Sequence, residues 1–354
     1  MPILPATESG IATAVKGLLE GHPVGLPTET VYGLACDARS DLAVARVFAA
    51  KGRPSFNPLI VHVDSLASAL KLAEFDPLSL QLAQQFWPGP LTLVVKRRDD
   101  CPISWLVSAG LDTVALRVPA HPVALRLLAV AAFPIAAPSA NPSGRLSPTQ
   151  AAHVQLPDYD VDVLDGGACT VGVESTVLRV VDGRAWLLRP GGLARQDIER
   201  LTGPLATSSE LNPENSKDNI AAQAATEPHR SPGQLLAHYA PTRPLRLNAL
   251  DVTAQEALLA FGPRVLPGAG TVLNLSVRGD VTEAAAHLFS YLRAADRDPF
   301  QGIAVMPIPH EGLGEAIRDR LQRAAAGSTL AQSVPHSSAQ PGGPDVRART
   351  SASD

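Results

Sequence analysis

Two cationic side chains and an amide stand close together in the segment KGRPSFNPL, residues 51–59. Lys51 and Arg53 follow a helical pattern and precede a proline-bounded strand, and Asn57 comes shortly after them. Such a group could hold a phosphate, because Arg engages oxygens in a bidentate fork and Lys supplies a mobile point charge. The ordinary alternative is a helix C-terminus whose solvated cations complement the helix dipole. Spacing alone favours the ordinary interpretation and leaves both open.

A polar cluster also interrupts an apolar stretch in LPTETVYGLACDA, residues 26–38. Thr28, Glu29 and Thr30 separate two apolar runs. They form either a surface turn or the wall of a site, and the pattern alone does not decide between these two interpretations.

Two arginines stand at the ends of predicted strands. Arg117 closes the apolar run TVALRVP, and Arg189 closes the run AWLLRPG. Ligands of α/β sheets tend to bind at strand ends, although an arginine at a sheet edge is the commoner explanation. His62 alternates with apolar neighbours in LIVHV. A lone histidine of this kind is more often a satisfied core or edge residue than a ligand.

The loop PSANPSGRLSPT, residues 138–149, is rich in hydroxyl and amide side chains. It contains Ser139, Asn141 and Ser147. Its ordinary interpretation is a turn that leads to a helix N-cap. The backbone N–H groups at such a helix start would also suit an anion.

The polar residues at these strand ends and loops share one character. They are rich in cations and hydroxyls and poor in carboxylates, apart from Glu29 and Glu174. A pocket of this composition suits a phosphate and a carboxylate, not glycoside cleavage or metal-only hydrolysis. The P-loop, HExxH and GxSxG motifs are absent from the sequence, so a nucleotide would bind outside the common motifs. The set comprises Thr30, Lys51, Arg53, Asn57, Arg117, Ser139, Asn141, Ser175 and Arg189.

The elements that must position these residues alternate between helical and strand patterns. Residues 9–21 predict a helix with Ser9 as a possible N-cap and Gly21 as its stop, and residues 147–155 carry a second helical pattern. Short β-branched or apolar runs lie between such helices. Mixed spacing of this kind indicates an α/β domain with a largely buried, twisted sheet.

The character of the sequence divides the chain into four parts. We expect one α/β domain over residues 3–195, then a polar linker over 196–243 that is rich in Ser, Asn, Glu and Pro. A second, smaller α/β pattern covers residues 244–330. The segment 333–354 has few large apolar residues, so we expect a disordered tail.

Composition narrows the class of protein. With 354 residues, a formal net charge of -4 and a pI near 6.1, the chain has no global attraction to nucleic acid or to anionic membranes. Its three cysteines lie far apart, which favours neither a disulfide framework nor a zinc site. A signal peptide and a long apolar span are both missing from the sequence. We therefore expect a cytoplasmic protein that does not associate with membranes.

Several ordered blocks resemble the Sua5/YrdC/YciO family. PTETVYGLACDA, KGRPSFNPLIVHV, FWPGPLTLVV, LRVPAHPVALRLL, PIAAPSANPSG, GVESTVL and LLRPGG are similar to its successive signature blocks over residues 3–195. SPGQLLAHYAPTRPL and EGLGEAIRDRLQRAA resemble the linker and C-terminal domain of the long Sua5 type. The resemblance implies a twisted mixed-sheet YrdC-like domain followed by a smaller, Rossmann-like C-terminal α/β domain. The linker departs from the family pattern at Gln234-Leu235-Leu236.

The resemblance also implies an activity: L-threonine, bicarbonate and ATP would give threonylcarbamoyl-AMP and pyrophosphate, for the N6-threonylcarbamoyl modification of adenosine 37 in tRNA. Catalysis would depend on positioning and charge neutralisation, with Lys51 and Arg53 stabilising charge and no side chain acting as a covalent nucleophile. Mg²⁺ would accompany ATP without a protein metal site, and a TsaD-type transferase would accept the product without stable tRNA binding here.

Carried over block by block, the resemblance assigns the binding residues. Within the triplet 28–30 we select Thr30, with Arg117 as the partner of the threonine carboxylate, and assign Glu29 no role. The linker would cross the cleft and exclude water from a labile product. The expected threonine contacts are Thr30, His62, Arg117, Ser139 and Ser175; the expected ATP contacts are Lys51, Arg53, Asn57, Thr113, Asn141, Ser147, Arg189 and Tyr239.

Two rival functions follow from related domains. One is a double-stranded RNA-binding module without catalysis, which the acidic net charge and the lack of interleaved basic and aromatic residues disfavour. The other is a different carbamoyl-adenylate enzyme of the hydrogenase-maturation kind. Such an enzyme would carry additional zinc-finger or acylphosphatase-like segments, which this sequence lacks.

Overall fold

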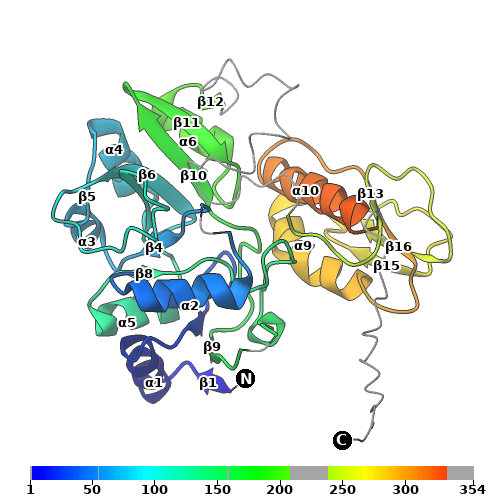
Figure 1. Ribbon diagram of the computed structural model, residues 1–354. Coiled ribbons are helices and arrows are strands. Elements are labelled where there is room, and N and C mark those ends of the chain that lie inside the picture. Colours follow the sequence, from blue (N-terminus) through cyan, green and yellow to red (C-terminus); the bar gives the residue numbers. More distant parts are fainter. Residues whose placement is uncertain (1, 55, 158, 208–237, 333–354) are drawn as a thin grey trace, which may run out of the picture.

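A computed structural model describes residues 2–54, 56–157, 159–207 and 238–332 of the chain. A large α/β domain stands beside a smaller one (Figure 1). The predicted tail 333–354 and residues 208–237 of the predicted linker lie outside the described residues.

The large domain is built on one sheet of 12 strands that mixes parallel and antiparallel pairs. Its strands are β1 (Ile3–Pro5), β2 (Val24–Leu26), β3 (Gly33–Asp37), β4 (Ile60–His62), β5 (Ala73–Glu74), β6 (Leu91–Arg97), β7 (Thr113–Arg117), β8 (Ile135–Ala136), β9 (Asp162–Asp165), β10 (Thr176–Val181), β11 (Arg184–Arg189) and β12 (Ala206–Thr207). The order is β1-β9-β2-β3-β8-β4-β7-β6-β10-β11-β12, with β5 beside β6. The expected mixed sheet is confirmed, and β12 adds a strand beyond residue 195.

Six α-helices of the described residues pack around this sheet: α1 (Glu8–Leu19), α2 (Asp41–Lys51), α3 (Leu66–Leu70), α4 (Pro77–Phe86), α5 (Pro122–Ala131) and α6 (Arg195–Thr202). Helix α2 begins at the N-cap Ser40, whose side chain accepts a hydrogen bond from the backbone N–H of Ala43. It ends where Gly52 adopts a left-handed conformation with φ of 56°. This turn places Lys51 in the last helical turn and sends Arg53 back toward the sheet.

Two local predictions were wrong. The N-cap of α1 is Thr7, which accepts from the N–H of Gly10, and not Ser9. The pattern at 147–155 forms only a 3-10 turn, Ala151–His153, in place of a helix. There the Thr149 hydroxyl contacts the Ser290 hydroxyl at 2.9 Å, so contacts with the smaller domain override the local helical preference.

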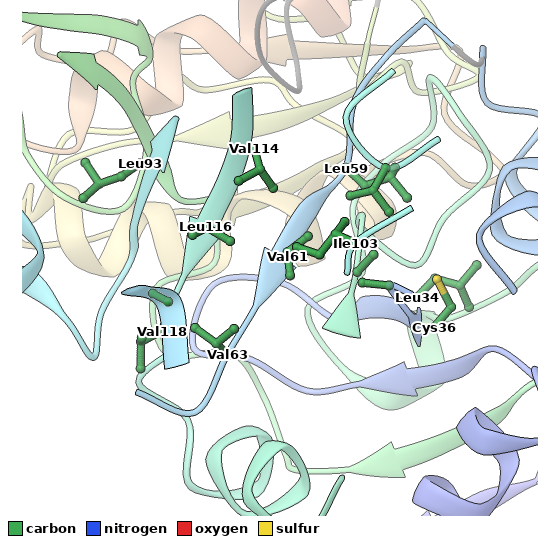
Figure 2. Close-up of a cluster of buried hydrophobic side chains, with 14 of the residues drawn as sticks. Leu34, Cys36, Leu59, Val61, Val63, Leu93, Ile103, Val114, Leu116 and Val118 are labelled. Atoms are coloured by element: carbon green, nitrogen blue, oxygen red, sulfur yellow. The ribbon is translucent and has the colours of Figure 1, made fainter. Parts of the chain in front are cut away.

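The core of the large domain lies against the face of the sheet drawn in Figure 2. Side chains two residues apart share a face of a strand, and Leu34 and Cys36 of β3 therefore point to the same side as Val114 and Leu116 of β7. A separate buried cluster with Ile60 covers residues of the opposite face. Burial of both faces fixes the strand registers, which in turn fixes where polar strand ends meet.

The smaller domain has a four-stranded parallel sheet and two long helices. Its elements are β13 (Leu245–Arg246), β14 (Glu256–Ala260), β15 (Thr271–Asn274), α9 (Val281–Ala295), β16 (Gly302–Val305) and α10 (Gly314–Gln332). Helices α9 and α10 lie on the side that faces the large domain (Figure 1).

The two domains are in close contact. Val31 and Val173 of the large domain belong to the same buried cluster as Phe289 of α9. Gly172 lies so near α9 that a Cβ atom there would stand 2.4 Å from the carbonyl oxygen of Ala285. The smaller domain therefore forms part of the surroundings of the polar loops that carry the candidate site.

Candidate active site

Most of the predicted site residues converge on one pocket of about 610 Å³, including its open mouth. The pocket lies where several strand ends of the large sheet meet residues 238–239. Predicted residues that line it are Thr30, Arg53, His62, Arg117, Ser139, Ser175, Arg189 and Tyr239. Four further predicted residues are buried and do not line it: Lys51, Asn57, Asn141 and Ser147.

Arg117 lines the pocket and is held by several neighbours. Its Nη1 donates to Thr30 Oγ1 at 2.9 Å, and its Nε donates to the carbonyl oxygen of Gly89 at 3.1 Å. Its Nη2 lies 2.6 Å from Glu29 Oε1, a contact that pairs the charges without hydrogen-bond geometry. Arg117 is 3% exposed and Glu29 is 5% exposed. The polar triplet 28–30 is thus a buried wall, not a surface turn, and Glu29 is the counter-ion of Arg117.

His62 lies beside Arg117 because β4 and β7 are parallel neighbours that end together, with these two residues in register. Burial, together with the nearby Arg117, lowers the pKa of His62 to about 3. Its Nδ1 is buried and has no hydrogen-bond partner among the described residues. The side chain is therefore a neutral imidazole that faces the pocket, which the ordinary interpretation of a satisfied core histidine does not explain.

Lys51 is buried, at 3% exposure, although a solvated helix end was the ordinary expectation. Its Nζ donates to the backbone carbonyl oxygens of Ser139 and Asn141. Burial lowers its pKa well below the ordinary value, and Arg53 adds to this effect. Lys51 thus holds the loop 139–143 against the end of α2.

Arg53 and Arg189 add two further cations to the lining of the pocket and lie near each other. Arg53 donates to the carbonyl oxygens of Asn57 at 3.1 Å and Pro58 at 2.9 Å. Burial together with Arg189 lowers the pKa of Arg53 to about 10. Arg189 Nη2 donates to the carbonyl oxygen of Ser175 at 2.8 Å. The guanidinium groups are thus oriented by backbone carbonyls.

Ser175 is held from two sides. Its hydroxyl lies 2.7 Å from the Thr92 hydroxyl on β6 and accepts from Arg189 Nη2 at 3.2 Å. Gly191 makes this packing possible, because a Cβ atom there would lie 2.3 Å from the carbonyl carbon of Ser175. The glycines of the LLRPGG block therefore have a steric role beside the site.

Ser147 contributes through Glu174, which also lines the pocket. The Ser147 hydroxyl donates to Glu174 Oε1 at 2.6 Å, and Arg320 Nε of α10 donates to Glu174 Oε2 at 2.9 Å. Burial alone would raise the pKa of Glu174, but Arg320, Arg189 and the Ser147 hydrogen bond lower it to about 2. Arg320 was not among the predicted site residues, and no local pattern distinguishes it from the other arginines of its helix.

His238 and Tyr239 close one side of the pocket. Their ring centroids are 4.0 Å apart, and the Tyr239 ring packs 5.4 Å from the ring of Phe289 on α9. Burial lowers the pKa of His238 to about 3. The prediction named Tyr239 alone, although its neighbour in the same HYAP motif also lines the site.

Thr113 is not part of this pocket, and its predicted contact with ATP is not supported. It begins β7, whereas Arg117 ends the same strand, so the two residues are separated by the strand's length of roughly 13 Å. Thr113 borders another hollow, together with Glu74 and Lys96. Asn141 is near the site, but its side-chain amide donates to the carbonyl oxygens of Pro142 and Arg145.

Within the part of the chain that the structure describes, His, Cys, Asp and Glu side chains form no group of three or more that could hold a metal ion. Glu29 and Glu174 are each engaged by an arginine. Among the described residues, no helix has the length and apolar character needed to cross a membrane.

The fold and the pocket define a two-domain α/β protein with a buried pocket that is lined by arginine, histidine and hydroxyl side chains. Two family models cover the chain: Sua5_yciO_yrdC, described as "Telomere recombination", matches residues 16–191, and Sua5_C, described as "Threonylcarbamoyl-AMP synthase, C-terminal domain", matches residues 193–326. The chain belongs to the Sua5/YciO/YrdC family, in the long form that carries a Sua5 C-terminal domain.

Individual relatives agree with this membership. The threonylcarbamoyl-AMP synthase of Bacillus subtilis (strain 168) is 38% identical over 347 residues, which is 92% of this chain and 96% of the relative. The protein of the same name from Pyrococcus abyssi (strain GE5 / Orsay) is 38% identical over 330 residues, with 89% and 94% covered. A crystal structure of P. abyssi Sua5 complexed with L-threonine matches with a TM-score of 0.80 and 35% identity, over 93% of this chain and 98% of that one.

Proposed function

We propose that this protein is a threonylcarbamoyl-AMP synthase that condenses L-threonine, bicarbonate and ATP and releases pyrophosphate. The observation that carries the proposal is that Arg117, Arg53 and Arg189 all line the same pocket, in a chain similar over most of its length to synthases of that name. A carboxylate partner and a phosphate partner in one pocket match a substrate pair of an amino acid and a nucleotide. The domain division at 3–195, 196–243 and 244–330 is part of the same proposal, except that α6 and β12 pack on the large sheet and extend the large domain to residue 207.

Threonine occupies the end formed by Arg117, Thr30 and His62 in this proposal. The fork of Arg117 is already oriented by Thr30 and Gly89, so it meets the amino acid carboxylate with little loss of conformational freedom. Because His62 is neutral, it accepts or donates a hydrogen bond without adding a charge to this end. Ser139 and Ser175 complete the predicted contacts with threonine.

ATP occupies the end formed by Arg53 and Arg189, with Lys51, Asn57 and Ser147 supporting that wall. Bicarbonate supplies carbon dioxide with loss of hydroxide, and the threonine amine attacks it and loses a proton, so that a carbamate forms with net release of water; a carbamate oxygen then attacks the α-phosphorus as pyrophosphate leaves. These steps need alignment and charge stabilisation but no nucleophilic side chain. The buried cations supply this stabilisation in a site from which most water is excluded.

Mg²⁺ enters with ATP in this proposal and shields its phosphates. The residues present fit this arrangement, because both carboxylates of the pocket region are engaged by arginines and the nucleotide brings its own phosphate ligands. The metal supplies charge neutralisation when bound, while this chain's own residues orient the two substrates.

Residues 238–239 supply a lid in this proposal, which excludes water from the labile carbamoyl adenylate. The position of Tyr239 between the pocket and Phe289 supports this role. If Tyr239→Ala leaves both the rate and the lifetime of the product unchanged, the lid proposal is wrong.

The product would pass to a TsaD-type transferase for the threonylcarbamoyl modification of adenosine 37 in tRNA. We place the protein in the cytoplasm, where that modification would draw on its product, and we expect no stable tRNA binding by this chain. Its net charge of -4 supports this expectation.

The experiment that tests the function measures pyrophosphate release from ATP by the purified protein, with L-threonine and bicarbonate each omitted in turn. Release that requires both co-substrates supports the proposal. Release that ignores threonine would refute it, and salt-sensitive binding of bare double-stranded RNA without ATP would favour the RNA-binding alternative.

A further inference from the structure

Arg320 of α10 is a completely buried arginine, at 0% exposure, that reaches from the smaller domain into the wall of the pocket. Its Nε donates to Glu174 Oε2 at 2.9 Å, and its Nη1 donates to the carbonyl oxygen of Pro190 at 2.6 Å and to Asp319 Oδ2 at 2.8 Å. Arginine is almost never fully buried unless it is paired. The hydrogen-bond and ion-pair partners of Arg320 therefore indicate which groups its charge compensates.

Glu174 is the one carboxylate among the described residues that lines the pocket. Its charge acts on the cations of the phosphate end: burial lowers the pKa of Lys51 and of Arg189, and Glu174 opposes both shifts. An uncompensated carboxylate at this position would repel the phosphates of ATP. In the structure both of its oxygens are engaged, Oε1 by Ser147 and Oε2 by Arg320.

We propose that Arg320 is a positioning residue for ATP: it neutralises Glu174 and holds the carboxylate against Ser147, so that ATP affinity depends on a cation supplied by the C-terminal domain. The inference rests on the proposed function, because it assumes that ATP binds at this end of the pocket. It gives the smaller domain a direct electrostatic part in a site built on the large domain.

The geometry supports charge neutralisation over simple domain attachment. A second ion pair joins the domains: Arg195 Nη2 lies 2.6 Å from Glu315 Oε1, also on α10. Neither of these residues lines the pocket. If the two arginines only attached the domains, their loss should affect ATP affinity equally. If Arg320 neutralises Glu174, only the loss of Arg320 should lower ATP affinity.

The test measures ATP binding by titration calorimetry, without threonine or bicarbonate, for a set of variants on the full chain. Arg320→Met leaves Glu174 uncompensated, and we expect the Kd for ATP to rise by about 10-fold or more, which corresponds to about 1.4 kcal/mol. Arg320→Lys retains the charge and should recover most of the affinity. Arg320→Met combined with Glu174→Gln removes both charges and should return the Kd to near the wild-type value.

Arg195→Met is the matched control, because it breaks an interdomain ion pair without touching the pocket. We expect its Kd for ATP to equal that of the wild type. An equal loss in Arg195→Met and Arg320→Met, or an unchanged Kd in Arg320→Met, would overturn the inference. If Arg320→Met does not fold, the double variant decides: a wild-type Kd supports neutralisation, and a raised Kd refutes it.

Kinetics separate this inference from the proposed function. Arg320→Met should raise KM for ATP while KM for threonine stays unchanged, because the threonine end contains a different ion pair. If wild-type protein binds ATP but releases no pyrophosphate with threonine and bicarbonate, the proposed function fails. The dependence of ATP affinity on Arg320 would still be measurable in that case.

Discussion

The ion pair between Arg117 and Glu29 allows stability and threonine recognition to be separated by mutation. Both side chains are almost fully buried, and Arg117 also donates to Thr30 and to Gly89. Removing one partner of a buried pair leaves an uncompensated charge, which costs about 3–5 kcal/mol. We therefore expect Arg117→Met to lower the free energy of unfolding by about that amount.

Adding Glu29→Gln to Arg117→Met removes both charges. Neutral side chains of similar size often replace a buried ion pair at little cost, so the double variant should unfold within about 1–2 kcal/mol of the wild type. It should not regain threonine affinity, because the cation for the carboxylate is still missing. Hydrogen bonds to a charged group contribute about 1.5–3 kcal/mol, which corresponds to a loss of roughly 10- to 150-fold in threonine affinity for both variants.

Urea unfolding and threonine titration by calorimetry, run on the same protein samples, measure the two effects. Glu29→Gln alone is the control for loss of the carboxylate, since it keeps Arg117 in place. If the double variant binds threonine with wild-type affinity, Arg117 is not the carboxylate partner. If it is no more stable than Arg117→Met alone, then burial of an unpaired Glu29 is not what destabilises the single variant.

Three further predictions concern the residues that support the site. Gly172→Ala would place a Cβ atom 2.4 Å from the Ala285 carbonyl oxygen, so it should lower the thermal unfolding midpoint. Gly183→Ala is the control, because φ is also positive there (+74°) but no heavy atom lies within 4 Å, and its midpoint should fall less. Equal effects would contradict a role of Gly172 in domain contact. Because the pKa of Glu174 in the folded protein is about 2, below its ordinary value of 4.5, its contribution to stability is present above about pH 4.5 and is lost as the pH falls toward 2. Urea unfolding should show a weaker acid dependence over that range in Glu174→Gln, and an unchanged dependence would refute this. Lys51→Met leaves two buried carbonyl oxygens unsatisfied, so it should lower the free energy of unfolding in urea by about 1–3 kcal/mol and weaken ATP binding. If neither the free energy of unfolding nor the ATP affinity changes, Lys51 does not hold the loop 139–143.

Much of the large domain could be predicted from the sequence, because the alternation of helical and strand patterns and the proline-bounded apolar runs indicate which segments are buried. Arg117 was expected at a strand end, whereas the pattern around His62 favoured a core or edge residue; the register of β4 and β7 places the two side by side. The spacing of residues in the sequence could not show which polar side chains are buried. Lys51 looks like a solvated helix end in the sequence, but the loop that covers it comes from residues 139–143, far along the chain.

The failures have a similar cause. Thr113 stands in the run TVALRVP together with Arg117, but these residues begin and end the same strand, so Arg117 lines the pocket and Thr113 does not. The helix expected at 147–155 gives way because Thr149 contacts Ser290 of the other domain. Arg320 could not be predicted from its neighbours in the sequence, because its role depends on a carboxylate 146 residues away in the chain.

The two carboxylates near the pocket are each matched by an arginine, but the arginines differ in origin. Arg117 ends β7, and Glu29 lies in a loop of the same domain, so both charges of this ion pair come from the large domain. Arg320 comes from the smaller domain, so the phosphate end acquires its full positive character only when α10 is docked. A change that removes Arg320 from Glu174 by undocking α10 should therefore weaken the binding of ATP before that of threonine. This order of loss distinguishes electrostatic completion of the site from a general loosening of the fold, which would weaken both substrates together.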